Sequence, residues 1–168
     1  MKNTKNNMGN AIFKRAIIVT CFIIFSNFKS IGCFCDNYES YFCRNANERY
    51  NIVLAVVTDS LEPHLMEAVV LENIYNETAR QVIDITGHDG GNCGEYLELF
   101  HIGDTLIFAL HETEYEGTLY WDLNGLGGRH YLEYKNGKVF GPIQDNIDSI
   151  SLDEFRENID NCIKLINY

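Results

Sequence analysis

The hydrophobic and polar positions downstream of residue 49 mostly follow the two-residue period of β-strands. Seven segments combine this character with the length of a strand: residues 50–58, 64–75, 81–86, 105–111, 118–123, 131–134 and 138–140. The first is a β-branched apolar run, and Asn136-Gly137 between the last two is a strong signal for a two-residue hairpin turn. The pattern therefore predicts a mainly β protein built from many short strands.

Turn-forming residues separate these segments. We expect a turn over residues 59–63, a break over residues 76–78 and a loop over residues 87–94, where glycine, asparagine and aspartate tolerate positive φ. Asp145 and Asp148 are expected to serve as turn and cap residues ahead of the C-terminal segment.

The apolar period changes to that of a helix at the C-terminus. Apolar residues recur there at helical spacing: Leu152, Phe155, Ile159, Ile163 and Ile166. Ser151 and Glu154 have the form of a capping box, with Ser151 as N-cap and the Glu154 side chain reaching back. We therefore expect a helix over residues 151–168, packed on a small β-barrel or sandwich.

The N-terminal segment has the features of an export signal. Lys14 and Arg15 precede ten uncharged, mostly apolar residues, a length that suits a signal-peptide core and falls short of the roughly 20 residues needed to span a bilayer. Small residues then precede Cys33, so we predict cleavage after Gly32; cleavage after Ser26 and an uncleaved membrane anchor are the alternatives. Residues 1–32 are interpreted as a signal peptide and residues 33–168 as a single domain.

The same site also fits a lipoprotein signal. Gly32 before Cys33 is typical of the end of a bacterial lipoprotein signal, in which the cysteine is lipidated. That signal usually has leucine three residues before the cysteine, where Ser30 stands here. Plain secretion is therefore preferred, and a lipid anchor at the cell surface is the alternative.

Charge excludes two classes of partner. The chain has 13 basic and 24 acidic residues, for a formal charge of −11. Five of the basic residues and none of the acidic ones precede Cys33, so the remainder carries −16. Such a surface repels phosphate and anionic lipid, which argues against nucleic acid as a partner and against membrane contact other than through a lipid anchor.

The cysteines indicate an oxidising compartment. Five of the six follow the signal and are all disulfide candidates: Cys33, Cys35, Cys43, Cys93 and Cys162. An odd number leaves one unpaired, whereas lipidation of Cys33 would leave four, with three possible connectivities.

The ordered motifs resemble one family. They are Cys33-Phe34-Cys35 at the new N-terminus, a strand over residues 52–57, Cys93-Gly94, and a Gly-Asp-x-Leu-x-Phe strand over residues 103–108. This set resembles the netrin-like domain, best known from the tissue inhibitors of metalloproteinases, and a set of small exported bacterial proteins that carry it alone. The match covers roughly residues 33–143. It implies a small OB-like Greek-key β-barrel, here with a C-terminal α-helix packed on it.

The resemblance also implies a disulfide and an inhibitory site. The family's first cysteine bridges to that of the Cys-Gly pair, here Cys33 to Cys93. In the inhibitors, the amine and carbonyl of the first cysteine chelate the zinc of the protease, so Cys33, Phe34 and Cys35 would form the inhibitory wedge. Phe34 stands where the inhibitors have a small or hydroxyl residue, and Asp36-Asn37 stand where they have proline.

Catalysis and metal binding are not predicted, and no cofactor is expected. Cys93 near His88 is better explained as a disulfide partner than as a nucleophile, and His111-Glu112 lacks the second histidine of a zincin helix. Most histidines are expected at the surface or in turns. The sequence thus favours an exported binding module with a protein partner outside the cytoplasm, the narrower hypothesis being a zinc metalloprotease inhibitor. The alternative is a surface-anchored lipoprotein with a structural or envelope role.

Two further groups of side chains each leave two interpretations open. Glu112, Glu114 and Glu116 would share one face of a strand, as a calcium or cation patch or as a solvated strand end. Trp121 and the nearby tyrosines would form a ligand-binding face or part of the core.

Overall fold

The computed structural model describes residues 41–46, 49–88, 95–123 and 129–164. All of them belong to one compact unit, Cys35–Tyr168. The signal peptide expected over residues 1–32 lies outside the described residues and stays a prediction.

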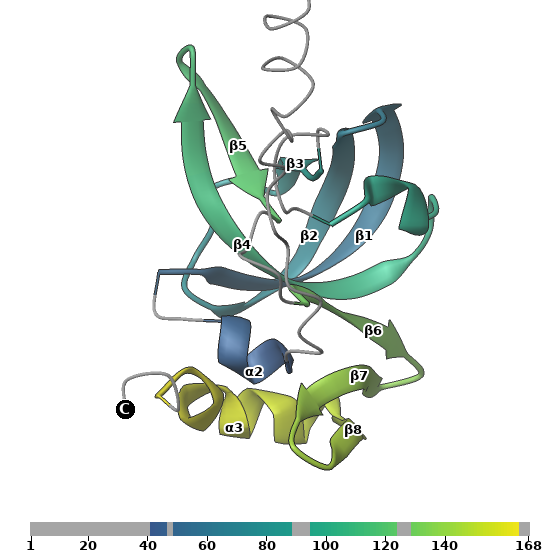
Figure 1. The fold of residues 1–168 in the computed structure, drawn as a ribbon, viewed down its shortest axis with the longest axis vertical. Helices are drawn as coiled ribbons and strands as arrows, with labels where there is room; N and C mark the ends of the chain where they lie inside the picture. The colour runs from purple at the N-terminus through teal and green to yellow at the C-terminus, as the bar shows by residue number, and fades with distance from the viewer. Residues whose placement is uncertain (1–40, 47–48, 89–94, 124–128, 165–168) are drawn as a thin grey trace, which may run out of the picture. The chain divides into compact units, whose positions relative to one another are not determined.

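The described chain is mainly β, as the sequence pattern predicts (Figure 1). Its strands are β1 (Asn51–Glu62), β2 (Leu65–Tyr75), β3 (Val82–Thr86), β4 (Thr105–Tyr115), β5 (Thr118–Asp122), β6 (Tyr131–Lys135), β7 (Lys138–Gln144) and β8 (Ile147–Ser151). The helices are α2 (Phe42–Asn45), the 3₁₀ turn η1 (Leu97–Leu99) and α3 (Leu152–Lys164).

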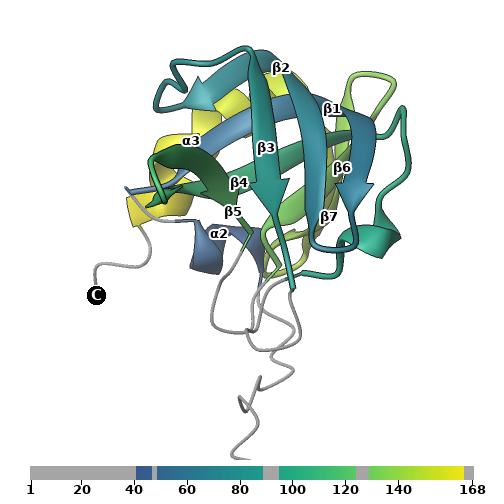
Figure 2. The same ribbon diagram turned by 90° about the horizontal axis from the view of Figure 1, so that it is seen from above.

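Five of the strands form a ring. Their order is β1-β2-β3-β5-β4, and pairing of β1 with β4 closes it (Figure 2). The pairs are antiparallel except β3–β5, which is parallel and joins only Ile85 to Trp121 and Thr86 to Asp122. Strands β6, β7 and β8 extend the sheet from β4 as a meander. The expected mainly β fold with a C-terminal helix packed on it is therefore confirmed.

Strand β1 contributes to two hydrophobic cores, which explains the continuous apolar run near residue 52. Along β1, Ile52 and Leu54 belong to one cluster, and Val53 and Ala55 belong to the other. The second cluster fills the ring around Trp121. The first lies between the outside of the ring and the elements α2, β7 and α3, which lie together in Figure 1. Both faces of β1 are buried, so the strand carries no polar alternation there.

Helix α3 forms where the apolar spacing predicts it. The buried stripe is Leu152, Phe155, Ile159, Cys162 and Ile163. The Glu154 backbone N–H donates to Ser151 Oγ over 3.1 Å, which confirms Ser151 as the N-cap. Arg156 ties the helix to the ring because its Nε and a terminal nitrogen donate to the Glu72 carboxylate of β2, at 2.7 and 2.6 Å.

Several element boundaries differ from the prediction. The turn expected over residues 59–63 is wrong in its extent, because β1 continues to pair with β2 as far as Glu62 and Leu65. Register shifts along this ladder let the hairpin stay paired through a polar segment. Strand β4 likewise runs beyond the expected residue 111 to Tyr115. The Asn136-Gly137 turn is confirmed, with φ of 54° and 78°.

Strand β8 and helix α2 were not predicted. Asp148, expected in a turn or cap, lies in β8, which pairs with β7 across the turn at Asn146. The segment is short and polar, so pairing with β7 rather than its own pattern makes it a strand. Helix α2 is only four residues long and is held by burial of Phe42 and Cys43.

Candidate functional site

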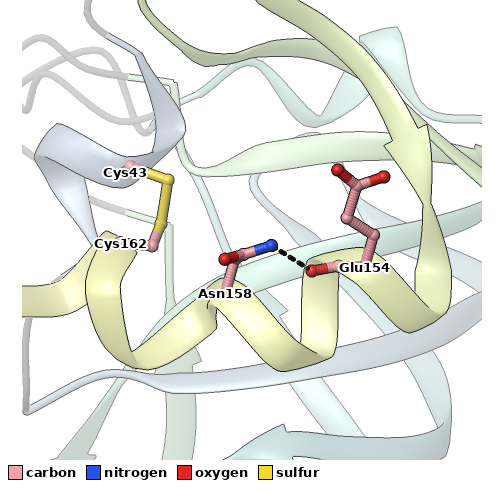
Figure 3. The surroundings of a disulfide bond; sticks show 4 residues. All are labelled: Cys43, Glu154, Asn158 and Cys162. Carbon is pink, nitrogen blue, oxygen red and sulfur yellow. Dashed lines mark hydrogen bonds between the residues drawn. A yellow bond between two sulfur atoms is a disulfide. The ribbon is translucent and has the colours of Figure 1, made fainter.

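A disulfide joins the two helices. Cys43 of α2 and Cys162 of α3 are bonded across a sequence separation of 119 residues, with their Cα atoms 4.8 Å apart (Figure 3). Both residues are buried. The structure thus pairs two of the five candidate cysteines, in a connectivity that the sequence left open.

The remaining candidate residues are Cys33, Phe34, Cys35 and Cys93, and all four lie outside the described residues. The inhibitory wedge and the Cys33–Cys93 bridge therefore stay predictions.

A groove lies beside the disulfide, between the β7–β8 hairpin and α3. Its volume is about 530 Å³, and we call it the cap groove. Apolar side chains form its floor: Ile143 and Phe155 are buried, and Ile147 and Ile150 are half-buried. The disulfide lies toward one end of α3 and Glu154 toward the other (Figure 3). Sequence analysis missed this groove because one of its walls is the unpredicted strand β8.

The rim of the cap groove is polar. Gln144, Glu154, Asn158 and Asn161 line it and are exposed. Asn158 Nδ2 donates to the Glu154 backbone carbonyl over 2.9 Å, which leaves the Asn158 side-chain oxygen available as an acceptor. Glu154 is the one ionisable side chain among the lining residues, because both lining cysteines are oxidised.

The Glu154 carboxylate stands apart from the helix backbone in Figure 3. Only half of the predicted capping box is formed: the Ser151 hydroxyl caps the helix, but Ser151 itself pairs with Lys138 in the β7–β8 ladder. Within the described part of the chain, the Glu154 carboxylate makes no hydrogen bond or ion pair. It is therefore available to a ligand in the groove.

Glu154 supplies the charge in the lining of the cap groove. Asp148 of β8 and Glu157 and Asp160 of α3 are exposed, like Glu154, and so is Lys138 of β7, whose backbone pairs with Ser151. Among the side chains described on α3, Arg156 is the one base, and it is engaged by Glu72 and Asp153. The hydrogen bond to Glu72 is the main reason that the pKa of Arg156 is raised. The rim therefore presents negative charge.

A buried histidine lies away from the groove. His130 is 2% exposed, so it is an exception to the expectation that most histidines lie at the surface or in turns. Its backbone is held beside β4: the Ala109 N–H donates to the His130 carbonyl over 2.8 Å, and the His130 N–H donates to the Glu95 carboxylate. The ring packs against Tyr50, with 5.6 Å between centroids, and neither nitrogen has a hydrogen-bond partner among the described residues. Burial lowers the pKa of His130 to about 4.

This histidine makes stability depend on pH. Above about pH 6.5 it is neutral in both states, but between about pH 6.5 and 4 the unfolded chain binds a proton that the folded chain does not. From pH 7.5 to pH 5, the free energy of unfolding of the wild-type protein should therefore fall by about 2 kcal/mol more than that of the His130→Leu variant. Urea titrations of both proteins measure it. Burial raises the pKa of Glu95 in both proteins, so that contribution cancels, and parallel pH profiles would contradict the prediction.

Two other sequence hypotheses are decided by burial and backbone geometry. Trp121 is fully buried inside the ring, so it belongs to the core and not to a ligand-binding face. Glu116 lies in the β4–β5 turn with a φ of 51°, so it does not share a strand face with Glu112 and Glu114.

No cluster of three or more metal-ligating side chains is present in the described ranges. In those same ranges, no helix is both long and apolar enough to cross a bilayer.

Comparison of the chain with protein-family models, with curated proteins and with solved structures finds no match in any of the three. The netrin-like resemblance therefore rests on the sequence motifs alone. The chemistry of the cap groove is the main guide to function.

Proposed function

We propose that this protein is an exported, non-catalytic binding module whose contact surface is the cap groove. The observation that carries this proposal is the groove itself, with an apolar floor, a rim of hydrogen-bonding groups and a volume of about 530 Å³. Ligand and peptide sites have this size and composition. A single exposed carboxylate on the rim suits recognition better than proton transfer, which needs a matched acid and base.

The disulfide supports export. Cys43–Cys162 is a structural bridge between buried residues, and such bridges persist in oxidising compartments. It also links α2 to α3 beside the groove, so it holds the site in shape without a ligand. The basic and apolar N-terminus supplies the matching export signal.

The narrower proposal is a netrin-like inhibitor of a zinc metalloprotease. A five-stranded ring that contains one parallel pair is compatible with a small OB-like barrel. In this proposal, cleavage after Gly32 frees the Cys33 amine for zinc, and Phe34 enters the specificity pocket of the protease.

Cysteine parity favours a second candidate, a lipoprotein. The Cys43–Cys162 bond uses two of the five cysteines after the signal, which leaves Cys33, Cys35 and Cys93. If Cys33 carries lipid, Cys35 and Cys93 can pair and no thiol remains. If Cys33 is a free N-terminal residue, one thiol stays unpaired.

Intact mass and thiol counting of the exported protein distinguish the two candidates. For the secreted module, we expect a chain beginning at Cys33 with one reactive thiol. A lipid mass with no reactive thiol would establish the lipoprotein. A chain that still begins at Met1, with Cys43 and Cys162 reduced, would contradict export. Once a free Cys33 amine is shown, full activity of a panel of zinc proteases at saturating protein would eliminate the inhibitor hypothesis.

A neutral solvatochromic dye tests the groove as a binding site. Its fluorescence should rise with the wild-type protein and fall several-fold with Ile150→Gln, which makes the floor polar. Leu61→Gln is the matched control, since Leu61 is exposed near the β1–β2 turn and does not line the groove. Equal fluorescence in both variants would remove the groove from the proposal.

A further inference from the structure

We propose that the occupant of the cap groove is a segment of a partner protein that carries apolar side chains next to lysine or arginine. This inference rests on the proposed function, because it assigns a ligand class to the same groove. Two features carry it: the apolar floor, and the Glu154 carboxylate, which has no ion-pair partner among the described residues.

The floor selects apolar side chains. Ile147 and Ile150 are half-buried and pack against the hydrophobic cluster that includes Ile143 and Phe155. An apolar side chain placed on them removes their remaining exposed surface from water, which is the main favourable term in such association. The volume of about 530 Å³ accommodates a few side chains rather than a whole domain.

The rim selects positive charge. The Glu154 carboxylate points away from the helix and has no ion-pair partner among the described residues. The exposed Asp148, Glu157 and Asp160 belong to the same two elements, β8 and α3. The oxygens of Gln144 and Asn158 supply acceptors for the same ligand. A lysine or arginine beside the apolar side chain would pair with Glu154 at the edge of an apolar floor, where water screens charges less than on an open surface.

The same charge disfavours other occupants. A second copy of this chain would bring its own net negative charge against the rim, and phosphate-bearing ligands would be repelled in the same way. The chain's own last four residues, 165–168, include apolar side chains and follow directly on α3. Deletion of residues 165–168 tests whether these residues occupy the groove themselves.

The test is the anisotropy of short peptides that carry a neutral fluorescent label, measured against the full exported protein. A lysine–leucine peptide should bind at least about tenfold tighter than a glutamate–leucine peptide and a lysine–serine peptide of equal length, and its binding should weaken with salt. Glu154→Lys should weaken it by about tenfold. Glu112→Lys makes the same charge change at an exposed position on β4 that does not line the groove, and should weaken it less than twofold. If Glu154→Lys does not fold, Glu154→Gln should still weaken binding by about threefold.

Each other result overturns the inference in a different way. Equal weakening by the two lysine variants would show attraction to net charge and not to the groove. Equal binding of the lysine–leucine and glutamate–leucine peptides, with the neutral dye displaced, would keep the groove as a binding site and remove the cationic assignment. Binding only after deletion of residues 165–168 would show that the chain's own C-terminus is the occupant. Absence of both dye and peptide binding would remove the proposed function together with this inference.

Discussion

Removal of the Cys43–Cys162 disulfide is expected to lower the free energy of unfolding by about 4–5 kcal/mol. The bond closes a loop spanning a sequence separation of 119 residues, so in the chain-entropy model it excludes a large share of the unfolded ensemble. That loss is a large fraction of the total stability of a typical domain. Urea titration of the oxidised protein and of the double variant Cys43→Ala/Cys162→Ala measures it.

The control separates the cross-link from side-chain packing. The reduced wild-type protein keeps both buried cysteine side chains, so it should unfold within about 1–2 kcal/mol of the double variant measured under the same reducing conditions, where any bridge made by Cys33, Cys35 or Cys93 is open in both proteins. If the reduced and oxidised wild-type proteins unfold at the same urea concentration, the cross-link does not restrict the unfolded state. We also expect the neutral dye to bind the reduced protein more weakly, because Cys43 and Cys162 both line the cap groove.

Replacement of Trp121 by alanine is expected to cost about 3–5 kcal/mol. The indole is fully buried in the ring, and the guanidinium of Arg80 lies 5.8 Å from its centroid. Its backbone lies opposite Ile85 in the β3–β5 pairing, which has only two residue pairs and completes the ring. The variant therefore leaves a large cavity next to the shortest strand pairing of the ring. Urea titration followed by circular dichroism measures the change.

Trp121→Phe is the matched control. Phenylalanine keeps most of the apolar volume and removes an indole N–H that has no hydrogen-bond partner among the described residues. We expect it to cost only about 1–2 kcal/mol, since it removes an unsatisfied donor along with some packing. Equal losses for the two variants would show that volume at this position does not hold the ring together. Trp121 is the only tryptophan in the chain, so a blue-shifted emission of the wild-type protein reports its burial independently.

Local patterns account for what could be predicted. The Asn136-Gly137 hairpin is correct because a two-residue turn of this type depends on the φ of those residues alone. The α3 stripe through Phe155 and Ile159 is correct because helical spacing aligns one face regardless of its partner. The strand near Ile52 is correct because a β-branched apolar run suits a strand buried on both faces.

The candidate site depends on contacts between distant segments. Nothing near Cys43 indicates that it pairs with Cys162, and β8 becomes a strand only because β7 lies beside it. The backbone of His130 bonds to Ala109 and Glu95 and its ring packs against Tyr50, and no pattern around residue 130 reveals these contacts. The cap groove is formed by β8, α3 and the disulfide together, so the pattern of no single segment predicts it.

The amino-acid order thus carries the strands, the C-terminal helix, the acidic charge and the six cysteines, because each is a property of neighbouring residues or of composition. Three features arise only on folding: ring closure through β1–β4 and β3–β5, the pairing of Cys43 with Cys162, and the cap groove with Glu154 at its rim. Each of these features needs groups from distant parts of the chain to come within a few ångströms. Packing of the whole core, and not any one segment, supplies the free energy that holds them together.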